Sequence, residues 1–247
     1  MHPTQPAPEP LSPARSPSRV VTSSQSGPHP KLEKRVRKHL ESRFLAPIAA
    51  YSREAHARLL TTWDGRVPLV LDSACGTGES SATLARRHGE ALVVGIDQSA
   101  ERLERGQRKL AASARPENLL LLRADATELW ALLAADGVRL SHHYLLYPNP
   151  WPKSEHLQRR WHGHPRFREL LALGGVLELR SNWRLYAEEF ALALRLAGRP
   201  AEVGPVPAGD PPLTPFERKY GESGHALWQV SSRSVGAAQA GNTPVDR

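Results

Sequence analysis

Short apolar runs alternate with segments of helical periodicity through most of this chain. Five of the apolar runs are typical of strands: 69–72, 91–97, 119–123, 142–147 and 176–179. Helical segments lie between and after them, near 79–88, 99–113, 127–135, 165–172 and 184–197. Strands that alternate with helices in this way predict a mostly parallel sheet with right-handed crossovers, the doubly wound α/β class.

The C-terminal part of the pattern adds two strands to this sheet. Residues 198–215 are rich in Pro and Gly and predict a loop that contains one short strand at 201–203. A last strand at 226–231 brings the predicted sheet to seven strands. We therefore expect one α/β domain over residues 63–231 and a flexible tail over residues 232–247.

The N-terminal part has a different character. Residues 1–30 contain eight prolines and six serines and have little to bury, so we expect a disordered leader. The apolar residues that follow recur every four positions: Leu32, Val36, Leu40, Phe44 and Ile48. They predict a basic amphipathic helical segment over residues 31–62, broken or kinked at Pro47. This segment packs on the domain as a solvated helix or lies along a phosphate backbone, and the two interpretations are compatible.

Composition narrows the class of protein. A single cysteine in 247 residues excludes a disulfide framework and a cysteine-based zinc site, and it fits a reducing cytoplasm. No apolar run reaches the roughly 18 residues that a membrane helix needs, and the first residues lack the apolar core of a signal peptide. We therefore expect a soluble cytoplasmic protein with no membrane partner.

The net charge of +8 is unevenly distributed. Residues 1–62 carry ten Lys and Arg against four Asp and Glu, a balance of +6, whereas residues 63–231 carry 21 against 20, a balance of +1. Within the second range, residues 151–168 hold five basic residues and one acidic residue, a balance of +4. A basic N-terminal segment and one basic patch predict a polyanionic partner.

Small residues follow the first predicted strand and open the next helix. The stretch D-S-A-C-G-T-G over 72–78 lets the backbone approach a ligand at the carboxyl end of the sheet. Asp97, at the end of the second strand, lies where an acidic residue binds ribose hydroxyls, and these features leave a nicotinamide cofactor and S-adenosylmethionine (SAM) both open. Asp125, after the third strand, offers a carboxylate to an adenine amino group and favours SAM. The predicted cofactor site consists of Asp72, Ala74, Gly76, Gly78, Asp97, Asp125 and Ala126.

The fourth predicted strand leads into a basic stretch that is interrupted by prolines. Residues 147–161 read Y-P-N-P-W-P-K-S-E-H-L-Q-R-R-W. Asn149 lies between two prolines at the carboxyl end of the strand, so its side chain is rigidly aimed at the crevice. Trp151 offers a surface on which a base can stack, and the cations that follow can hold phosphates.

This stretch resembles the hallmark of the bacterial tRNA (guanine-N7)-methyltransferase family, P-D-P-W-x-K-x-x-H-x-x-R-R. Two further stretches are similar to family motifs: 173–187, which resembles L-x-P-G-G…T-D-W-x-x-Y-A, and 214–218, which resembles T-K-F-E-x-[RK]. The resemblance covers residues 67–230 and implies a Rossmann-like class I methyltransferase fold. It also implies transfer of a methyl group from SAM to N7 of a guanine in tRNA, in the course of tRNA processing.

The resemblance carries specific roles onto residues of this chain. It implies SAM contacts at Asp72, Asp97 and Asp125, and it places Asn149 at the catalytic position. The substrate contacts that it and the basic patch imply are Lys153, Arg159, Arg160, Asn182, Thr214, Phe216 and Glu217. Asn149 and Asn182 replace aspartates of the family pattern, so two carboxylates beside the substrate base are lost.

These two replacements keep other functions open. The Asn149 stretch is also similar to the N-P-P-[YFW] element of exocyclic-amine methyltransferases, in which an amide oxygen accepts hydrogens from the target nitrogen. A family member directed to another RNA site, an amine or a small molecule is one alternative, and a non-catalytic RNA-binding paralogue is another.

The histidines over 142–164 have no clustered acidic partner, so we expect no metal site. We expect removal of residues 1–62 to weaken RNA binding and to leave SAM affinity nearly unchanged.

Overall fold

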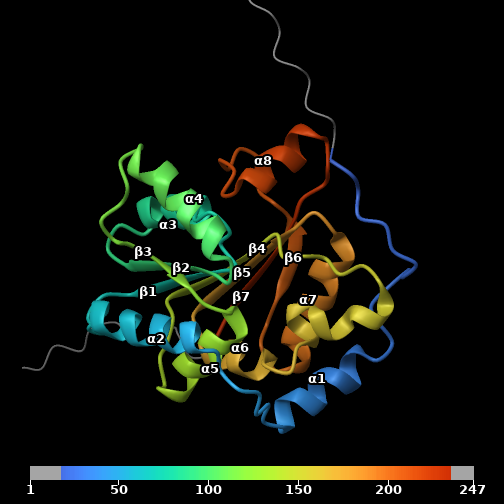
Figure 1. The fold of residues 1–247 in the computed structure, drawn as a ribbon. Coiled ribbons are helices and arrows are strands. Elements are labelled where there is room, and N and C mark those ends of the chain that lie inside the picture. The colour runs from blue at the N-terminus through green and yellow to red at the C-terminus, as the bar shows by residue number, and fades with distance from the viewer. Residues whose placement is uncertain (1–17, 235–247) are drawn as a thin grey trace, which may run out of the picture.

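A seven-stranded sheet runs through the centre of the protein in the computed structural model, which describes residues 18–234 (Figure 1). The strands lie in the order β3-β2-β1-β4-β5-β7-β6, and β7 is antiparallel to both of its neighbours while the other pairs are parallel. The predicted doubly wound class is confirmed, and the order reverses between β1 and β4. Their bounds are β1 (Leu69–Ser73), β2 (Leu92–Asp97), β3 (Leu119–Arg123), β4 (His142–Leu146), β5 (Val176–Ser181), β6 (Glu202–Pro205) and β7 (Trp228–Arg233).

Successive residues of each strand pack on opposite faces of the sheet. In β1, Leu69 and Leu71 join one apolar core and Val70 joins the other. One face is covered by α1 (Leu32–Glu41), α2 (Ala50–Thr62), α5 (Ala126–Ala135), α6 (Phe167–Ala172) and α7 (Arg184–Leu196). The other face is covered over β1, β2 and β3 by α3 (Glu79–Arg87) and α4 (Ala100–Ala111). Because both faces of β1, β2 and β3 are buried, these three strands are nearly continuous apolar runs.

The two N-terminal helices are built into the first of these cores. Leu32, Val36 and Leu59 are 1 %, 0 % and 0 % exposed, and they pack in the same core as β1 and α7. Removal of residues 1–62 would therefore open the core, which contradicts the expectation that SAM affinity would survive that deletion. Helix α1 ends at Glu41, earlier than the apolar stripe predicts: Ser42 is extended, and both its backbone N–H and its hydroxyl donate to the carbonyl oxygen of Lys38.

The segment before α1, residues 18–31, is extended and follows the edge of the molecule from α8 (Pro215–Glu222) to α1 (Figure 1). We call this segment the strap. Its backbone and side chains make defined contacts with the domain, so this part of the predicted leader is ordered against it. Residues 1–17 and 235–247 of the predicted leader and tail lie outside the described residues.

Helix α8 was not predicted, because the expected loop over 198–215 reaches only its first residue and no element was assigned before the last strand. The sequence carries its start signal, because Thr214, Pro215 and Glu217 form the S/T-x-x-E pattern of a capping box with proline at the first helical position. The Oγ1 of Thr214 accepts a hydrogen bond from the backbone N–H of Glu217 at 2.9 Å. No helix in the described range is long and apolar enough to cross a bilayer.

Candidate functional site

The chain turns sharply between β1 and α3. Ala74, Gly76 and Gly78 all have positive φ angles, of 61°, 63° and 75°. Glycine adopts this conformation freely, whereas an alanine in it is strained by about 1–2 kcal/mol. A Cβ at Gly76 would meet nothing within 4 Å, so that side of the turn is open. The turn therefore presents its backbone to open space at the carboxyl end of β1, where α/β sheets bind ligands.

The other side of the turn is closely packed. A Cβ on Gly78 would lie 2.8 Å from the Leu121 side chain, and one on Gly106 would lie 1.8 Å from the carbonyl oxygen of Thr77. Gly106 belongs to α4, so this helix touches the turn through bare backbone. The sequence analysis missed Gly106, although a glycine within a helical pattern is a signal of close approach.

Asp72 lies in β1 directly below the turn and is buried. Its Oδ2 accepts hydrogen bonds from the hydroxyls of Ser80, at 2.6 Å, and Ser81, at 2.7 Å, while its Oδ1 has no partner. Burial raises the pKa of Asp72 to about 6, although the two serine hydroxyls act in the opposite direction. The site thus contains one buried carboxylate oxygen that is free to accept a hydrogen bond from a ligand.

Asp97 ends β2 and ties the turn to the neighbouring strand. Its Oδ2 accepts a hydrogen bond from the backbone N–H of Gly76 at 2.9 Å, and its Oδ1 accepts one from Ser99 at 2.8 Å. The Nη2 of Arg102 lies 3.2 Å from Oδ1. Asp97 therefore sets the shape of the turn, and its oxygens retain lone pairs for further donors.

Asp125 begins α5 and caps it. Its Oδ1 accepts hydrogen bonds from the backbone N–H groups of Thr127, at 2.9 Å, and Glu128, at 3.2 Å, and from the Thr127 hydroxyl at 2.7 Å. Ala126 is the first residue of the helix and is buried. The contacts predicted between these two residues and a cofactor stay predictions, and the structure adds the capping role.

The loop after β4 carries Asn149 and has an unusual backbone. Tyr147 and Trp151 have φ angles of 52° and 45°, in a region that bulky residues rarely adopt. Asn149 is exposed, and its Oδ1 accepts a hydrogen bond from the backbone N–H of Trp151 at 3.3 Å. Both the position and the side-chain orientation of Asn149 therefore depend on a strained loop.

Exposed cations surround this loop. The Arg159 guanidinium lies over the ring of Trp151, 4.6 Å from its centroid, and Lys153 is exposed beside it. The other ring contact of Trp151 is His156, edge-on at 5.4 Å. An aromatic ring and exposed cations in one place form a surface suited to a stacked base and its phosphates.

Arg160 does not belong to this surface, so its predicted contact with the substrate is wrong. Its side chain is 0 % exposed and its Nη1 lies 2.5 Å from Oε2 of Glu189 on α7. The remaining nitrogens donate to the carbonyl oxygen of Trp151 and to Gln25. A buried guanidinium needs such partners, because its charge cannot be solvated by water.

The residues predicted near α8 form a separate group beside the loop. Thr214 is the buried cap of the helix, and Glu217 is buried with its Oε1 2.6 Å from Nη1 of Arg180. Oε2 of Glu217 is buried without a partner, and Glu217 is one of the residues that line a cleft of about 560 Å³. Phe216 is 58 % exposed. Asn182 is half-buried, with its Nδ2 3.4 Å from the ring of His225. Their contacts with a substrate stay predictions.

Neighbouring strands bring these features together. Strand β1 pairs with β4 with Asp72 opposite Tyr144, so the turn and the Asn149 loop leave the same edge of the sheet side by side. Strand β5 pairs with β4 on its other side, carries Arg180 near its end and is followed by Asn182. The glycine turn, the Asn149 loop and the segment after β5 thus leave the same edge of the sheet, whereas Arg160 is buried. The sequence analysis missed Ser80 and Ser81, which lie shortly after Asp72 in the sequence. It also missed Gln25, Glu189 and Arg180, whose partners are distant in the sequence.

Comparison with known proteins agrees with this architecture. The model of a protein family described as "Putative methyltransferase" matches residues 66–230. A tRNA (guanine-N(7)-)-methyltransferase of Pseudoalteromonas atlantica is 31% identical over 181 residues, which is 68% of this chain and 73% of that protein. A protein of the same name from Sodalis glossinidius is 32% identical over 200 residues, 75% of this chain and 81% of the relative.

Solved structures share the fold. The 16S rRNA methyltransferase KamB superposes with a TM-score of 0.53 and 22% identity, covering 78% of this chain and 99% of that one. A point mutant of a 16S rRNA (adenine(1408)-N(1))-methyltransferase from Catenulisporales acidiphilia, solved with the cosubstrate SAM, gives a TM-score of 0.51 and 19% identity, covering 80% and 99%. At these identities the likeness concerns the fold.

Proposed function

The chain belongs to the tRNA (guanine-N7)-methyltransferase family, and we propose that it transfers a methyl group from SAM to N7 of a guanine in tRNA. The observation that carries this proposal is the juxtaposition of the glycine turn after β1 with the Asn149 loop after β4. These two strands are neighbours at the point where the strand order reverses, which is where open α/β sheets bind ligands.

The residues at the turn fit SAM. When bound, SAM supplies a methyl group on a positively charged sulfur and carries a free ammonium group. The unpartnered, buried Oδ1 of Asp72 is a suitable acceptor for that ammonium group. Asp97 would bind the ribose hydroxyls, and the start of α5 at Asp125 and Ala126 would face the adenine. The open side of the turn at Gly76 leaves room for the ligand.

Asn149 would hold the target base. N7 of guanine has a free lone pair, so its methylation removes no proton and needs no general base in the attack. Orientation of the reacting atoms is worth up to about 7–11 kcal/mol, and Asn149 contributes by hydrogen bonding to the base. An aspartate at this position would also stabilise the positive charge that forms on the base, and Asn149 lacks that charge. The proposal therefore predicts an active enzyme that is slower than an aspartate-bearing one.

Two basic surfaces would hold the RNA backbone. The first is Trp151 with Lys153 and Arg159, beside Asn149. The second is one face of α1, where Lys31, Lys34, Arg35 and Lys38 fall three or four residues apart and hence side by side.

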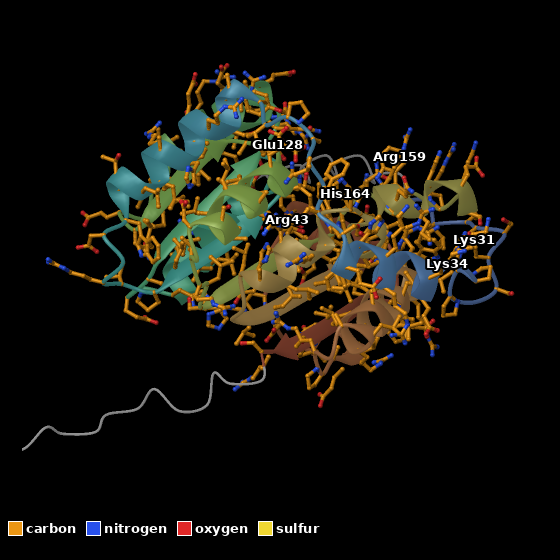
Figure 2. The ribbon with its side chains drawn as sticks, turned by 90° about the horizontal axis from the view of Figure 1, so that it is seen from below. Lys31, Lys34, Arg43, Glu128, Arg159 and His164 are labelled. Carbon is orange, nitrogen blue, oxygen red and sulfur yellow. The ribbon has the colours of Figure 1, made fainter. Side chains whose placement is uncertain are left out.

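A contact between α1 and the short helix η1 (Ser154–Arg159) joins the two surfaces. The Arg35 guanidinium lies against the side-chain amide of Gln158, next to Arg159. Figure 2 shows Lys31, Lys34 and Arg159 on the same side of the molecule. In the part of the chain that the structure describes, Lys31 and Lys34 form no ion pair, whereas Arg37 on another face pairs with Glu33. Unpaired cations are available to phosphates, so the surface continues from α1 to Trp151.

The direct test is incubation of the full chain with methyl-labelled SAM and an unmodified tRNA transcript, followed by digestion and nucleoside analysis. We expect label in 7-methylguanosine, and we expect no label when the target guanine is replaced by 7-deazaguanine, which has no N7. Label in an exocyclic-amine product would contradict the proposal and favour the similarity of Asn149 to amine methyltransferases. Absence of heat on titration with SAM would contradict any SAM-dependent transfer.

A further inference from the structure

The strap runs along the loop that carries Asn149 and is attached at three places. At its start, the backbone N–H of Ser18 donates to Oγ of Ser223 at 3.1 Å, just after α8. In its middle, Oγ of Ser23 donates to the carbonyl oxygen of Pro152 at 2.7 Å. Near its end, the backbone N–H of His29 donates to Oε1 of Glu189 at 2.7 Å. The strap thus connects α8, the Asn149 loop and α7 (Figure 1).

The Gln25 side chain of the strap contacts two buried charged residues of the domain. Its Oε1 accepts a hydrogen bond from Nη2 of Arg160 at 2.6 Å, and its Nε2 donates to Oε1 of Glu189 at 3.2 Å. Arg160 and Glu189 are both 0 % exposed and pair with each other, and His162 lies 2.9 Å from the same carboxylate. A single side-chain amide therefore bridges both members of a buried ion pair.

Arg160 connects Gln25 to the loop that carries Asn149. Its Nε and Nη2 donate to the carbonyl oxygen of Trp151 at 3.2 and 3.0 Å, and Nη2 also donates to that of Lys153 at 3.4 Å. Trp151 has a positive φ and donates its N–H to Oδ1 of Asn149. A backbone conformation that is unfavourable for tryptophan persists only where its surroundings stabilise it. The hydrogen bonds from Arg160 to the Trp151 carbonyl oxygen provide that stabilisation.

From these contacts we propose that the strap positions the Asn149 loop for catalysis, with Gln25 as the positioning residue that acts through Arg160. This inference rests on the proposed function, because it assigns Asn149 to the substrate base. Gln25 fixes the plane and position of the Arg160 guanidinium, the guanidinium fixes Trp151, and Trp151 fixes Asn149. Loss of Gln25 leaves the Arg160–Glu189 pair in place, so the fold persists while the loop gains freedom.

The test compares Gln25→Ala with Ser24→Ala in the full chain. Ser24 is the neighbouring strap residue, its side chain is exposed, and it makes no hydrogen bond in the described structure. We expect Gln25→Ala to lower kcat about tenfold, which equals about 1.4 kcal/mol in activation free energy, with the SAM Kd within twofold of the parent. Ser23→Ala, which removes the bond to Pro152, should lower kcat by a smaller factor. Ser24→Ala should match the parent.

Hydrogen–deuterium exchange provides a readout that needs no substrate. We expect peptides over 147–153 to exchange faster in Gln25→Ala than in Ser24→Ala, with β5 and α7 unchanged. A Gln25→Ala protein with kcat within twofold of the parent and unchanged exchange over 147–153 would overturn the inference. Faster exchange throughout the domain would overturn it as well, because it would show a general structural role. If the parent chain does not methylate tRNA, only the proposed function is contradicted. The exchange comparison would still decide whether the strap orders the loop.

Discussion

The two halves of the site are built in different ways. The cofactor half consists of β1, the turn and α3 with Asp97 from the next strand, and its contacts join residues that lie close in sequence, such as Asp72 and Ser80. The substrate half joins Gln25 to Arg160 and Ser18 to Ser223, which are 135 and 205 residues apart. A local unit can be recognised from its motif, whereas a unit made of distant segments exists only after folding. The internal contacts of the first half are therefore local, although it rests on the common core, whereas the internal contacts of the second join distant segments.

The largest effect is expected from Glu189→Gln, in the substrate half. Burial alone would raise the pKa of Glu189, but the hydrogen bond from His162 and the charges of His162 and Arg160 lower it well below its usual range, so this carboxylate is ionised. Its loss leaves Arg160 buried without a counter-charge, and we expect the free energy of unfolding to fall by about 3–5 kcal/mol in urea titrations. The control is Glu188→Gln, an exposed pair with Arg184, for which we expect at most about 0.5 kcal/mol. Equal effects at 188 and 189 would contradict the importance of the buried pair.

The corresponding change in the cofactor half is Asp97→Ala. It frees the backbone N–H groups of Gly76 and Ser99 and removes the acceptor proposed for the ribose, so we expect SAM affinity to fall about 100-fold or more, that is, by about 2.7 kcal/mol. Calorimetric titration measures the Kd, and Asp64→Ala, far from the turn and exposed, serves as the control. A variant that binds SAM as tightly as the parent would show that the ribose contact has been misplaced.

The basic face formed by Lys31 and α1 can be weakened by changing side chains that make no hydrogen bond or ion pair within either half in the described structure. We expect the double variant Lys31→Gln, Lys34→Gln to raise the tRNA KM about tenfold and to lower the slope of log K against log salt by about 1–2, because two phosphate contacts are lost. kcat and the SAM Kd should stay within twofold. Arg108→Gln, exposed on α4, is the matched loss of charge on the other side of the sheet. If Arg108→Gln weakens tRNA binding as much per lost charge as the Lys31 and Lys34 variant does, the basic surface on α1 is not a specific tRNA-binding surface.

Asp72 makes the cofactor half sensitive to pH. Folding raises its pKa above the ordinary value of 3.8 to about 6, so the native state holds the proton more tightly and the free protein loses stability as pH rises from about 4 to about 6. A cationic ligand prefers the ionised form, so we expect SAM affinity to increase about tenfold between pH 5 and pH 7. Asp72→Asn should bind more weakly and show a flat profile over this interval. Equal pH profiles for the parent and Asp72→Asn would remove Asp72 from the ligand site.

The smallest effect is expected from Asn149→Asp, which restores the carboxylate of the family pattern. Asn149 is exposed, so solvent weakens any added electrostatic stabilisation of the methylated base, and we expect kcat to rise about threefold to tenfold. Asn182→Asp is the matched change at the second position where an asparagine replaces an aspartate of the family pattern, and the Asn182 amide already contacts His225. A fall in kcat for Asn149→Asp would indicate that the chain uses the amide itself, as amine methyltransferases do.

The sequence by itself determined the class of fold and located the turn proposed to bind the cofactor, whose contacts with SAM stay predictions. The strand over 119–123 was predicted to the residue, because buried parallel strands are continuous apolar runs bounded by polar turns. The turn over 72–78 and Asp97 followed from their positions at strand ends. Helix α8 could have been predicted as well, since its capping box is a local signal.

Only the tertiary structure decided the roles of the charged residues in the substrate half. Arg159 and Arg160 are adjacent and chemically identical, yet one lies over Trp151 in solvent and the other is buried against Glu189. Their difference arises from the direction in which the short helix η1 ends and from the partners that α7 and the strap bring to that place. Neither partner is near Arg160 in sequence, and no periodicity marks Gln25. Whether a charged side chain is exposed to RNA or buried in the core depends on the residues around it, and those residues come together only when the chain folds.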